Sequence, residues 1–218
     1  MSTFPDLLER RLRTDPSSPF VTFYDDATGE RTELSVTTYA NWVSKTANLF
    51  VEELMLDPGD DLRVDLPPHW LGVVFRGAAW SCGLGLAPDA PVAILGPDAL
   101  ARTDAPRAAT TMACALHPFA TRFSEPLPEG VLDHGVLWAG QSDVFSPLEP
   151  TELMPSAPSD ERVITDLNPL AEPGGELLLD LVAGTGSLVL VANAGTAQWP
   201  AHSQSERATA SLRATELI

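Results

Sequence analysis

The sequence predicts an α/β fold in which a mainly parallel sheet forms the middle of three layers, with helices on both faces. Helical segments alternate with short apolar runs along most of the 218 residues. These runs show little polar alternation, as is typical of parallel strands buried on both faces. A hydrophobic content of 44% is ordinary for a globular chain, and the length suffices for one domain with a sizeable core. We therefore expect residues 1–218 to form a single domain.

The elements are assigned from the spacing of apolar residues and from the turn residues between them. Helices are predicted where apolar residues recur every three or four positions, at 4–13, 35–55, 70–82, 174–182 and 203–212. Strands are predicted where short apolar runs are bounded by turn residues, at 20–24, 31–34, 62–66, 86–88, 92–95, 110–116, 136–138, 162–165, 187–192 and 214–218.

Local signals fix several of these elements. Leu7 and Leu12 share one side of the first helix, which Pro16 ends. The Asp- and Gly-containing stretch 25–30 predicts a hairpin between the first two strands. The apolar stripe of the helix over 35–55 consists of Tyr39, Trp42, Val43, Ala47, Phe50 and Leu54.

The second half of the chain is expected to complete the sheet that residues 60–140 begin. The strands over 162–165 and 187–192 are nearly all apolar and need cover on both faces. Before them, residues 143–161 carry four prolines among serines and acids, which predicts a long surface loop. This loop is expected to pack against the domain and cover part of its surface, because it contains several apolar residues: Val144, Phe145, Leu148, Leu153 and Met154.

Composition limits the partners and the compartment. The net charge of −17 argues against nucleic acid and anionic membranes, and no run approaches the ~20 apolar residues of a membrane span. Cys82 and Cys114 match no zinc or redox spacing. We expect buried free thiols in the cytoplasm, since the first residues do not resemble a signal peptide. Lys45, the one lysine, falls on the polar side of its helix, where a solvated side chain is expected.

A glycine-rich stretch, VAGTGSLVLV over 182–191, superficially resembles a phosphate-binding loop. A phosphate loop runs from a strand through a glycine-rich turn into a helix, so that helix amides face the anion. Here the predicted order is helix, turn, strand, which points the carbonyl end of a helix at the turn. No lysine follows the glycines. The stretch is therefore interpreted as a structural turn.

Two segments of the chain resemble the N-terminal part of adenylate-forming enzymes, the superfamily of acyl-CoA synthetases, luciferases and peptide synthetases. Over residues 31–88, features matching that family in order include Thr38-Tyr39, Ala47-Asn48, Pro58-Gly59-Asp60, Ala78-Ala79 and Pro88. Residues 160–218 are similar to the segment that follows the family's nucleotide loop, with 183–190 at a helix-to-strand turn. The chain is also similar to short actinobacterial proteins of a truncated type.

The resemblance implies a truncated domain without the family's catalytic parts. The nucleotide loop T-S-G-[ST]-T-G-x-P-K has no match, and the proline-rich loop 143–161 stands in its place. The adenine motif, the ribose-binding aspartate, the hinge and the C-terminal domain with its catalytic lysine are not found either. We therefore expect no catalytic residues, no cofactor and no adenylation of a carboxylic acid by this chain alone.

Other candidate sites are weak on sequence grounds. His69, His117, His134 and His202 show no paired metal-ligand spacing, so no metal site is expected. Ser187 and Ser203 lack a G-x-S-x-G elbow. Adjacent acids are expected to be solvated, at 25–26, 52–53 and 60–61. Among the tryptophans, Trp42 is expected in the core and Trp199 in an exposed loop.

Three classes of function stay open. The first is a non-catalytic relative that binds another protein, the second a small-molecule module that kept an acyl or nucleotide cleft. The third is a ligase half-enzyme completed by another chain. A homodimer is expected in addition, because the predicted closing strand 214–218 ends in Leu217 and Ile218 and its free edge would invite a symmetric partner.

Overall fold

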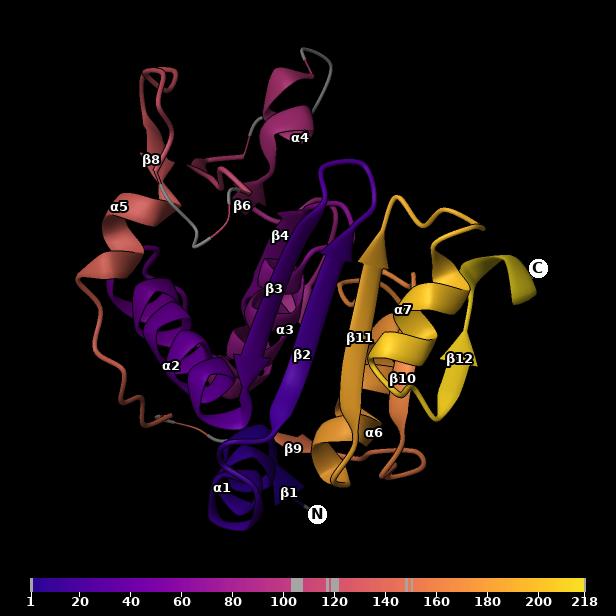
Figure 1. The fold of residues 1–218 in the computed structure, drawn as a ribbon. Coiled ribbons are helices and arrows are strands. Elements are labelled where there is room, and N and C mark those ends of the chain that lie inside the picture. The colour runs from indigo at the N-terminus through magenta and orange to yellow at the C-terminus, as the bar shows by residue number, and fades with distance from the viewer. Residues whose placement is uncertain are drawn as a thin grey trace. The chain divides into compact units, whose positions relative to one another are not determined.

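A computed structural model of the chain describes residues 2–102, 108–116, 118, 122–147, 149 and 151–217. It contains two compact units, each built around a sheet (Figure 1). Unit 1 combines three stretches, Met1–Ala40, Pro68–Val73 and Glu152–Ile218. Unit 2 consists of Asn41–Pro67 and Val74–Thr151.

The sheet of unit 1 has five strands in the order β12-β10-β11-β2-β3. Four strands run parallel, and β3 returns antiparallel to β2 as the second arm of a hairpin. Val189 of β11 lies opposite both Ile164 and Thr22, which fixes the register across the centre of the sheet. The strand bounds are β2 (Pro19–Asp25), β3 (Glu30–Ser35), β10 (Arg162–Thr165), β11 (Ser187–Ala192) and β12 (Ala210–Leu212).

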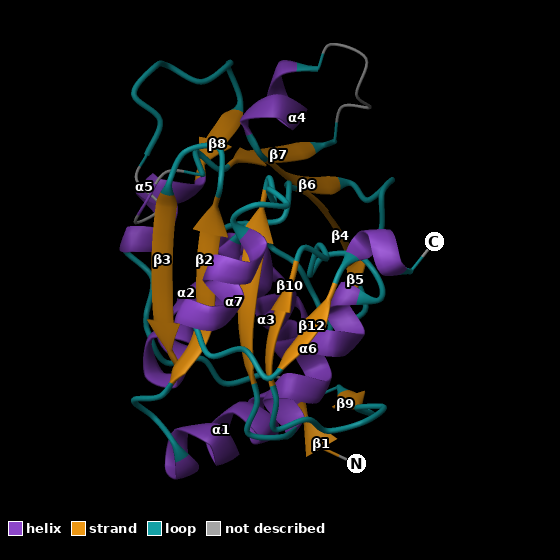
Figure 2. Cartoon of the chain, turned by 45° about the vertical axis from the view of Figure 1, so that its right-hand side comes forward, coloured by secondary structure: helices purple, strands orange, loops and turns teal. Residues whose placement is uncertain are grey.

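Helices cover both faces of this sheet. Two crossover connections link the parallel strands β10, β11 and β12. The chain moves across the sheet in one direction from β10 to β11 and in the other from β11 to β12. Because both crossovers are right-handed, their helices lie on opposite faces of the sheet (Figures 1 and 2). These two helices are α6 (Gly174–Ala183) and α7 (Trp199–Ser205). The helix α1 (Phe4–Thr14) packs on α6. A short ribbon joins β1 (Ser2–Thr3) to β9 (Glu152–Leu153).

The sheet of unit 2 is parallel throughout, in the order β5-β4-β6-β7-β8. Its strands are β4 (Asp61–Asp65), β5 (Gly85–Leu86), β6 (Val92–Leu95), β7 (Thr110–Ala113) and β8 (Val131–Asp133). Two long helices begin in unit 1 and continue into unit 2, α2 (Val36–Glu52) and α3 (Trp70–Cys82). Two short helices complete it, α4 (Pro97–Ala101) and α5 (His134–Ala139).

Most of the predicted elements are confirmed, and so is the α/β class with parallel sheets. The helix over 70–82 and the strands over 92–95, 162–165 and 187–192 have the expected bounds. The strand over 92–95 is buried along its whole length, and in the other two only the first residue is partly exposed, as is expected of interior parallel strands. Cys82 and Cys114 are buried free thiols, also as expected.

The expectation of one shared sheet is wrong. Strands β10 and β11 do not extend the sheet of β4, β6, β7 and β8, but pair with the N-terminal hairpin through β2. The physical reason lies in β2 itself. Phe20, Val21 and Phe23 are buried, so this strand is an interior one and needs a partner on the side away from β3.

Three predicted elements near chain turns are also wrong. Residues 136–138 belong to the helix α5, whose N-cap Asp133 accepts a hydrogen bond from the Gly135 amide. The last helix is Trp199–Ser205 and not 203–212. The closing strand is Ala210–Leu212, and Ala214–Glu216 form a 3₁₀ turn. Ile218 lies outside the described residues.

The proline-rich segment 143–161 only partly forms the expected cover. Residues 157–161 run along the end of α6, where Ala157 and Ser159 donate their amides to Asp180. However, Val144 and Met154 are 71% and 74% exposed, so these side chains cover nothing. Leu148 lies outside the described residues. No helix among the described residues is long and apolar enough to cross a membrane.

Candidate functional site

The glycine-rich turn 184–186 connects α6 to β11 in the order helix, turn, strand. Its three amides are all donated within the protein. Gly184 donates to Asp180 O at 3.0 Å, and Gly186 donates to Ser159 O at 2.9 Å. The amide of Thr185 donates to Asp160 Oδ1 at 2.8 Å. The backbone donors that a phosphate would need are therefore already used.

A buried arginine faces the carbonyl side of the same turn. Arg11 of α1 is 2% exposed, and its Nη1 lies 2.9 Å from Leu181 O and 3.0 Å from Gly186 O. Its Nε and Nη2 donate to Asp15 at 3.0 and 2.9 Å. The guanidinium thus satisfies carbonyls at the C-terminal end of α6, where a cation is favoured.

The two turn glycines have no room for a side chain. A Cβ on Gly186 would lie 2.6 Å from Ser159 O and 2.5 Å from Leu181 Cδ2. A Cβ on Gly184 would overlap Ser159 O as well. Glycine is required here by the close passage of segment 157–161, and not by an approaching ligand.

Acidic side chains gather at the carboxyl ends of the unit 1 strands, where open α/β sheets usually bind ligands. Asp26 accepts from the Gly195 amide at 2.9 Å, and its Oδ1 lies 2.7 Å from His202 Nε2. Asp25 accepts from Asn193 Nδ2 at 2.7 Å. The expectation of solvated acids at 25–26 is wrong, and His202, isolated in sequence, has a carboxylate partner. These bonds join the β2–β3 turn to the loop after β11.

A second polar network lies on the face of the sheet beside α7. Glu206 accepts from Arg162 Nη2 at 2.6 Å, from Arg31 Nη2 at 3.0 Å and from the Tyr24 hydroxyl. Burial favours a raised pKa for Glu206, but the hydrogen bonds from Tyr24, Arg162 and Arg31 outweigh it and hold the pKa below its ordinary value. Arg162 also donates to Ser187 Oγ at 3.0 Å. Every member has a partner, which is typical of a structural network.

The two remaining described histidines are buried. Burial lowers the pKa of His69 and of His134 to about 4. His69 Nδ1 accepts from the Leu71 amide at 3.1 Å. Neither Nε2 atom has a hydrogen-bond partner among the described residues. His117 lies outside the described residues.

A cysteine and a histidine meet in unit 2 without forming an activated pair. Cys114 Sγ lies 3.9 Å from His134 Nδ1. Burial raises the pKa of the Cys114 thiol to about 12, so the nucleophilic thiolate is strongly disfavoured. Both side chains are 1% exposed, which leaves no access for a substrate.

Lys45 and two tryptophans differ from their expected environments. Lys45 is half-buried and donates to Gln141 O at 2.5 Å, above the Trp138 ring. Trp42 is half-buried and stacks on Trp138 with ring centroids 3.6 Å apart. Trp199 is 8% exposed, because it opens α7 and packs beneath the guanidinium of Arg213. In the described part of the chain, no three His, Cys, Asp or Glu side chains are placed to hold a metal ion.

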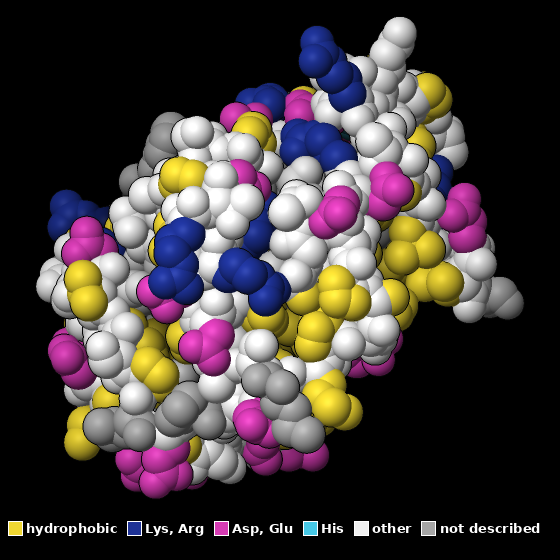
Figure 3. Space-filling model, turned by 90° about the horizontal axis from the view of Figure 1, so that it is seen from below, with side chains coloured by type: hydrophobic (Ala, Val, Ile, Leu, Met, Phe, Trp, Pro, Cys, Tyr) yellow, Lys and Arg dark blue, Asp and Glu magenta, His cyan; other side chains and the backbone are white. Residues whose placement is uncertain are grey.

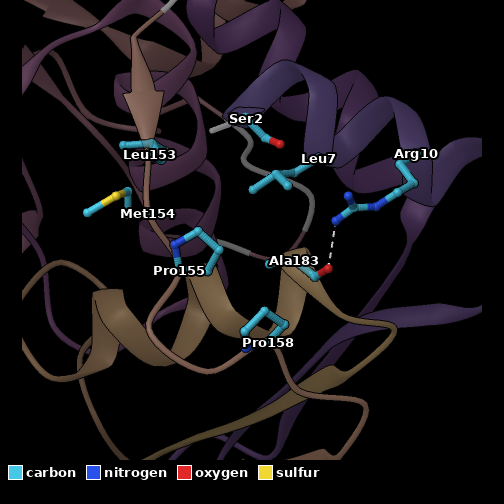
Figure 4. A pocket seen from close by; sticks show the side chains of 8 residues that line it. All are labelled: Ser2, Leu7, Arg10, Leu153, Met154, Pro155, Pro158 and Ala183. Carbon is cyan, nitrogen blue, oxygen red and sulfur yellow. Dashed lines mark hydrogen bonds between the residues drawn. The ribbon is translucent and has the colours of Figure 1, made fainter.

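An open pocket of about 440 Å³ lies in unit 1 between α1, the segment after β9 and the end of α6 (Figure 4). We call it the Arg10 pocket. Its lining is mostly apolar and consists of Ser2, Leu7, Arg10, Leu153, Met154, Pro155, Pro158 and Ala183. Arg10 Nη2 donates to Ala183 O at 2.6 Å. The sequence carries no local sign of this pocket, because its walls come from three segments far apart in the chain.

The fold is that of the N-terminal half of adenylate-forming enzymes. An acyl-CoA synthetase from Brucella canis matches 97% of this chain and 47% of its own, with a TM-score of 0.75 and 15% identity. The N-terminal domain of FACL13 from Mycobacterium tuberculosis matches 97% of this chain and 62% of its own, with a TM-score of 0.70 and 12% identity. An acetoacetyl-CoA synthetase from Streptomyces lividans matches 97% and 42%, with a TM-score of 0.70 and 15% identity. The chain therefore spans about half the length of the two full synthetases.

Comparison of sequences identifies a nearer relative. No protein-family model matches the chain. A TIGR03089 family protein of Mycobacterium tuberculosis (strain ATCC 25618 / H37Rv) is 35% identical over 189 residues, which cover 83% of this chain and 77% of that protein. At this identity and coverage, the chain belongs to the TIGR03089 family.

Proposed function

We propose that this chain is a non-catalytic member of the adenylate-forming fold that acts by binding another protein in the cytoplasm. The observation that carries the proposal is the turn 184–186. It is the one stretch whose composition suggests a phosphate loop, yet its amides are donated to Asp160, Asp180 and Ser159. Adenylation needs a triphosphate held by such donors and a cation placed against the developing charge.

The described cationic side chains near this turn support the same proposal. Arg11, the cation bonded to the turn itself, is buried against carbonyl oxygens and Asp15. The one lysine, Lys45, is bound to Gln141 O in unit 2. Residues 1–218 are proposed to act as a single domain, with 143–161 in place of the family's nucleotide loop.

Exposed apolar side chains favour a protein partner. Val136, Val144 and Met154 are more than half exposed, and Met154 adjoins the Arg10 pocket. At the Arg10 pocket, Met154 thus adds an exposed apolar group to a mostly apolar lining, as is typical of an interaction surface. A homodimer stays part of the proposal, since β12 pairs with β10 on one side and the described residues place no strand on the other.

Two alternatives have an observation in their favour. The Arg10 pocket, at about 440 Å³, falls in the size range of small-molecule sites and supports a small-molecule binding module. The match to about half of the synthetases supports a ligase half-enzyme completed by another chain.

Pyrophosphate exchange tests the proposal against these alternatives. The purified chain is incubated with ATP, Mg²⁺, labelled pyrophosphate and a mixture of alkyl and aryl carboxylic acids. We expect no exchange above the rate without protein. Exchange by the chain alone would overturn the proposal, and exchange that appears only with a second purified chain would establish the half-enzyme.

A further inference from the structure

We propose that the Arg10 pocket binds one bulky apolar side chain of a partner protein, with a neighbouring carboxylate of the same partner segment on Arg10. This inference rests on the proposed function of protein binding and names its site. The pocket lies in unit 1, at the end that carries α1, β1 and β9 (Figures 1 and 4).

The walls of the pocket suit an aliphatic or aromatic side chain. Leu7 is 2% exposed and is held by the packing of α1 on α6. Leu153 is held by the β1–β9 ribbon, in which it lies opposite Ser2. Pro155 and Pro158 supply rigid rings, and Figure 4 shows both beside the same space as Leu7. Because these walls are already ordered, an entering side chain costs little conformational entropy on the protein's side.

Arg10 is available for an anion. On the same helix, Arg11 pairs with Asp15 and Arg13 pairs with Glu9. Arg10 instead donates to Ala183 O, and no carboxylate pairs with it among the described residues. A guanidinium has five N–H donors in a planar fork, so one bond to a carbonyl leaves an edge for a carboxylate.

The openness of the pocket favours a protein segment over a free small molecule. Arg10 and Pro158 are exposed, and Met154 is 74% exposed. Small ligands usually bury most of their surface in the pocket that holds them. At protein interfaces, by contrast, an anchor side chain fills a pocket while the rest of the partner covers its rim. The flexible Met154 can close over such an anchor.

The net charge of the chain further limits the charge that the partner segment can carry. With a net charge of −17, the chain repels a segment that is acidic along its length. The face in Figure 3 nevertheless carries basic side chains among acidic and apolar ones. A segment with an apolar residue and a single adjacent carboxylate, in an otherwise neutral or basic context, fits both features.

Dipeptide titration of the ¹⁵N-labelled full chain tests this site by NMR. The probes are N-acetylated, C-amidated Leu-Asp and Asp-Leu. Leu-Asn and Ala-Asp, capped in the same way, serve as matched controls. We expect saturable shifts of the Leu7, Leu153 and Ala183 amides and of Arg10 Nε with at least one acidic leucine probe. The two controls should bind roughly fivefold more weakly or worse, as expected for a partly exposed charged contact and a lost apolar anchor.

Two variants separate the charge from the apolar walls. Arg10→Gln should abolish the preference for Asp over Asn while the preference for leucine over alanine persists. Met154→Asp should weaken all leucine probes. Arg13→Gln, on the same helix with a side chain 69% exposed, is the control and should leave every shift unchanged.

Several results would overturn the proposal. The first is that no saturable shifts appear at the pocket residues up to the solubility limit of the dipeptides. The second is that the preference for Asp over Asn survives Arg10→Gln. The third is that hexanoate binds more tightly than either acidic leucine probe. The last would assign the pocket to a small molecule. A titration without saturable shifts would refute only the proposed binding site. Pyrophosphate exchange by the same preparation would instead refute the proposal that the chain is non-catalytic.

Discussion

Arg11 donates to the carbonyl of Gly186, with Nη1 and O 3.0 Å apart, although 175 positions separate the two residues in the chain. This bond places a buried cation on the carbonyl side of the glycine-rich turn. On the amide side, Asp160 accepts from the backbone and the hydroxyl of Thr185, which lowers its pKa. The turn is therefore held from both sides by the protein itself.

Replacement of Arg11 should destabilise unit 1. Arg11→Met removes the donors of Leu181 O and Gly186 O and leaves buried carbonyls without partners. We expect the free energy of unfolding to fall by about 3 kcal/mol, measured by urea denaturation. Arg13→Met is the control, because its exposed ion pair with Glu9 contributes at most about 1 kcal/mol. Equal losses for both variants would contradict this account.

A methyl group on Gly186 should be poorly tolerated. Gly186→Ala forces a Cβ against Ser159 O and Leu181 Cδ2, so segment 157–161 must move. We expect a loss of about 2 kcal/mol or more in the same assay. Gly140→Ala is the matched control, since the nearest atom to its Cβ would be Leu137 O at 3.9 Å. A stable Gly186→Ala variant would contradict the close packing of segment 157–161 against this turn.

Stability should fall as the pH is lowered through the range of free histidine. Burial lowers the pKa of His69 and His134 from 6.5 to about 4, so between these values the unfolded chain binds protons that the folded chain does not. Each histidine stabilises the fold fully above pH 6.5 and loses this contribution toward pH 4, by about 1.4 kcal/mol per pH unit.

Denaturation measured between pH 6.5 and 4.5 checks this. The window ends at 4.5, the ordinary pKa of Glu206, whose lowered pKa in the fold removes most of its stabilising contribution only at more acid pH. His134→Gln should make the free energy of unfolding less dependent on pH in this window, by the equivalent of up to one bound proton. An unchanged slope would mean that this histidine is not buried in its neutral form.

Self-association should depend on the C-terminal region. The monomer has a mass of 23.3 kDa, and we expect light scattering at tens of micromolar to give about twice this value. Leu217 is 51% exposed, so Leu217→Glu should shift the population toward monomer without affecting the fold. Met55→Glu, at a side chain 77% exposed, is the control and should not. A 23.3 kDa particle for the unsubstituted chain would rule out the dimer at that concentration.

Sequence patterns predicted local structure well and long-range pairing poorly. Apolar runs such as Ser187–Ala192 carry their own strand signal, which needs no knowledge of the partner. The pairing of β11 with β2 joins segments far apart in the chain, and neither strand's sequence indicates which strand it pairs with. The same limit hid the Asp26–His202 contact, which spans 176 positions.

Some local errors had a signal that could have corrected them. Pro200 stands in the first turn of α7, where proline is favoured, and it marks the true start of that helix. Asp133 is a good N-cap for α5, but the apolar run 136–138 gave a competing strand signal. The Arg10 pocket had no local signal, because it forms only when α1, β9 and α6 come together.

The most direct test of the central claim is calorimetric titration of the chain with ATP and Mg²⁺. Because the amides of 184–186 and the guanidinium of Arg11 are already bonded within the protein, we predict no binding tighter than about millimolar, which corresponds to ~4 kcal/mol. Saturable micromolar binding of ATP would contradict the account.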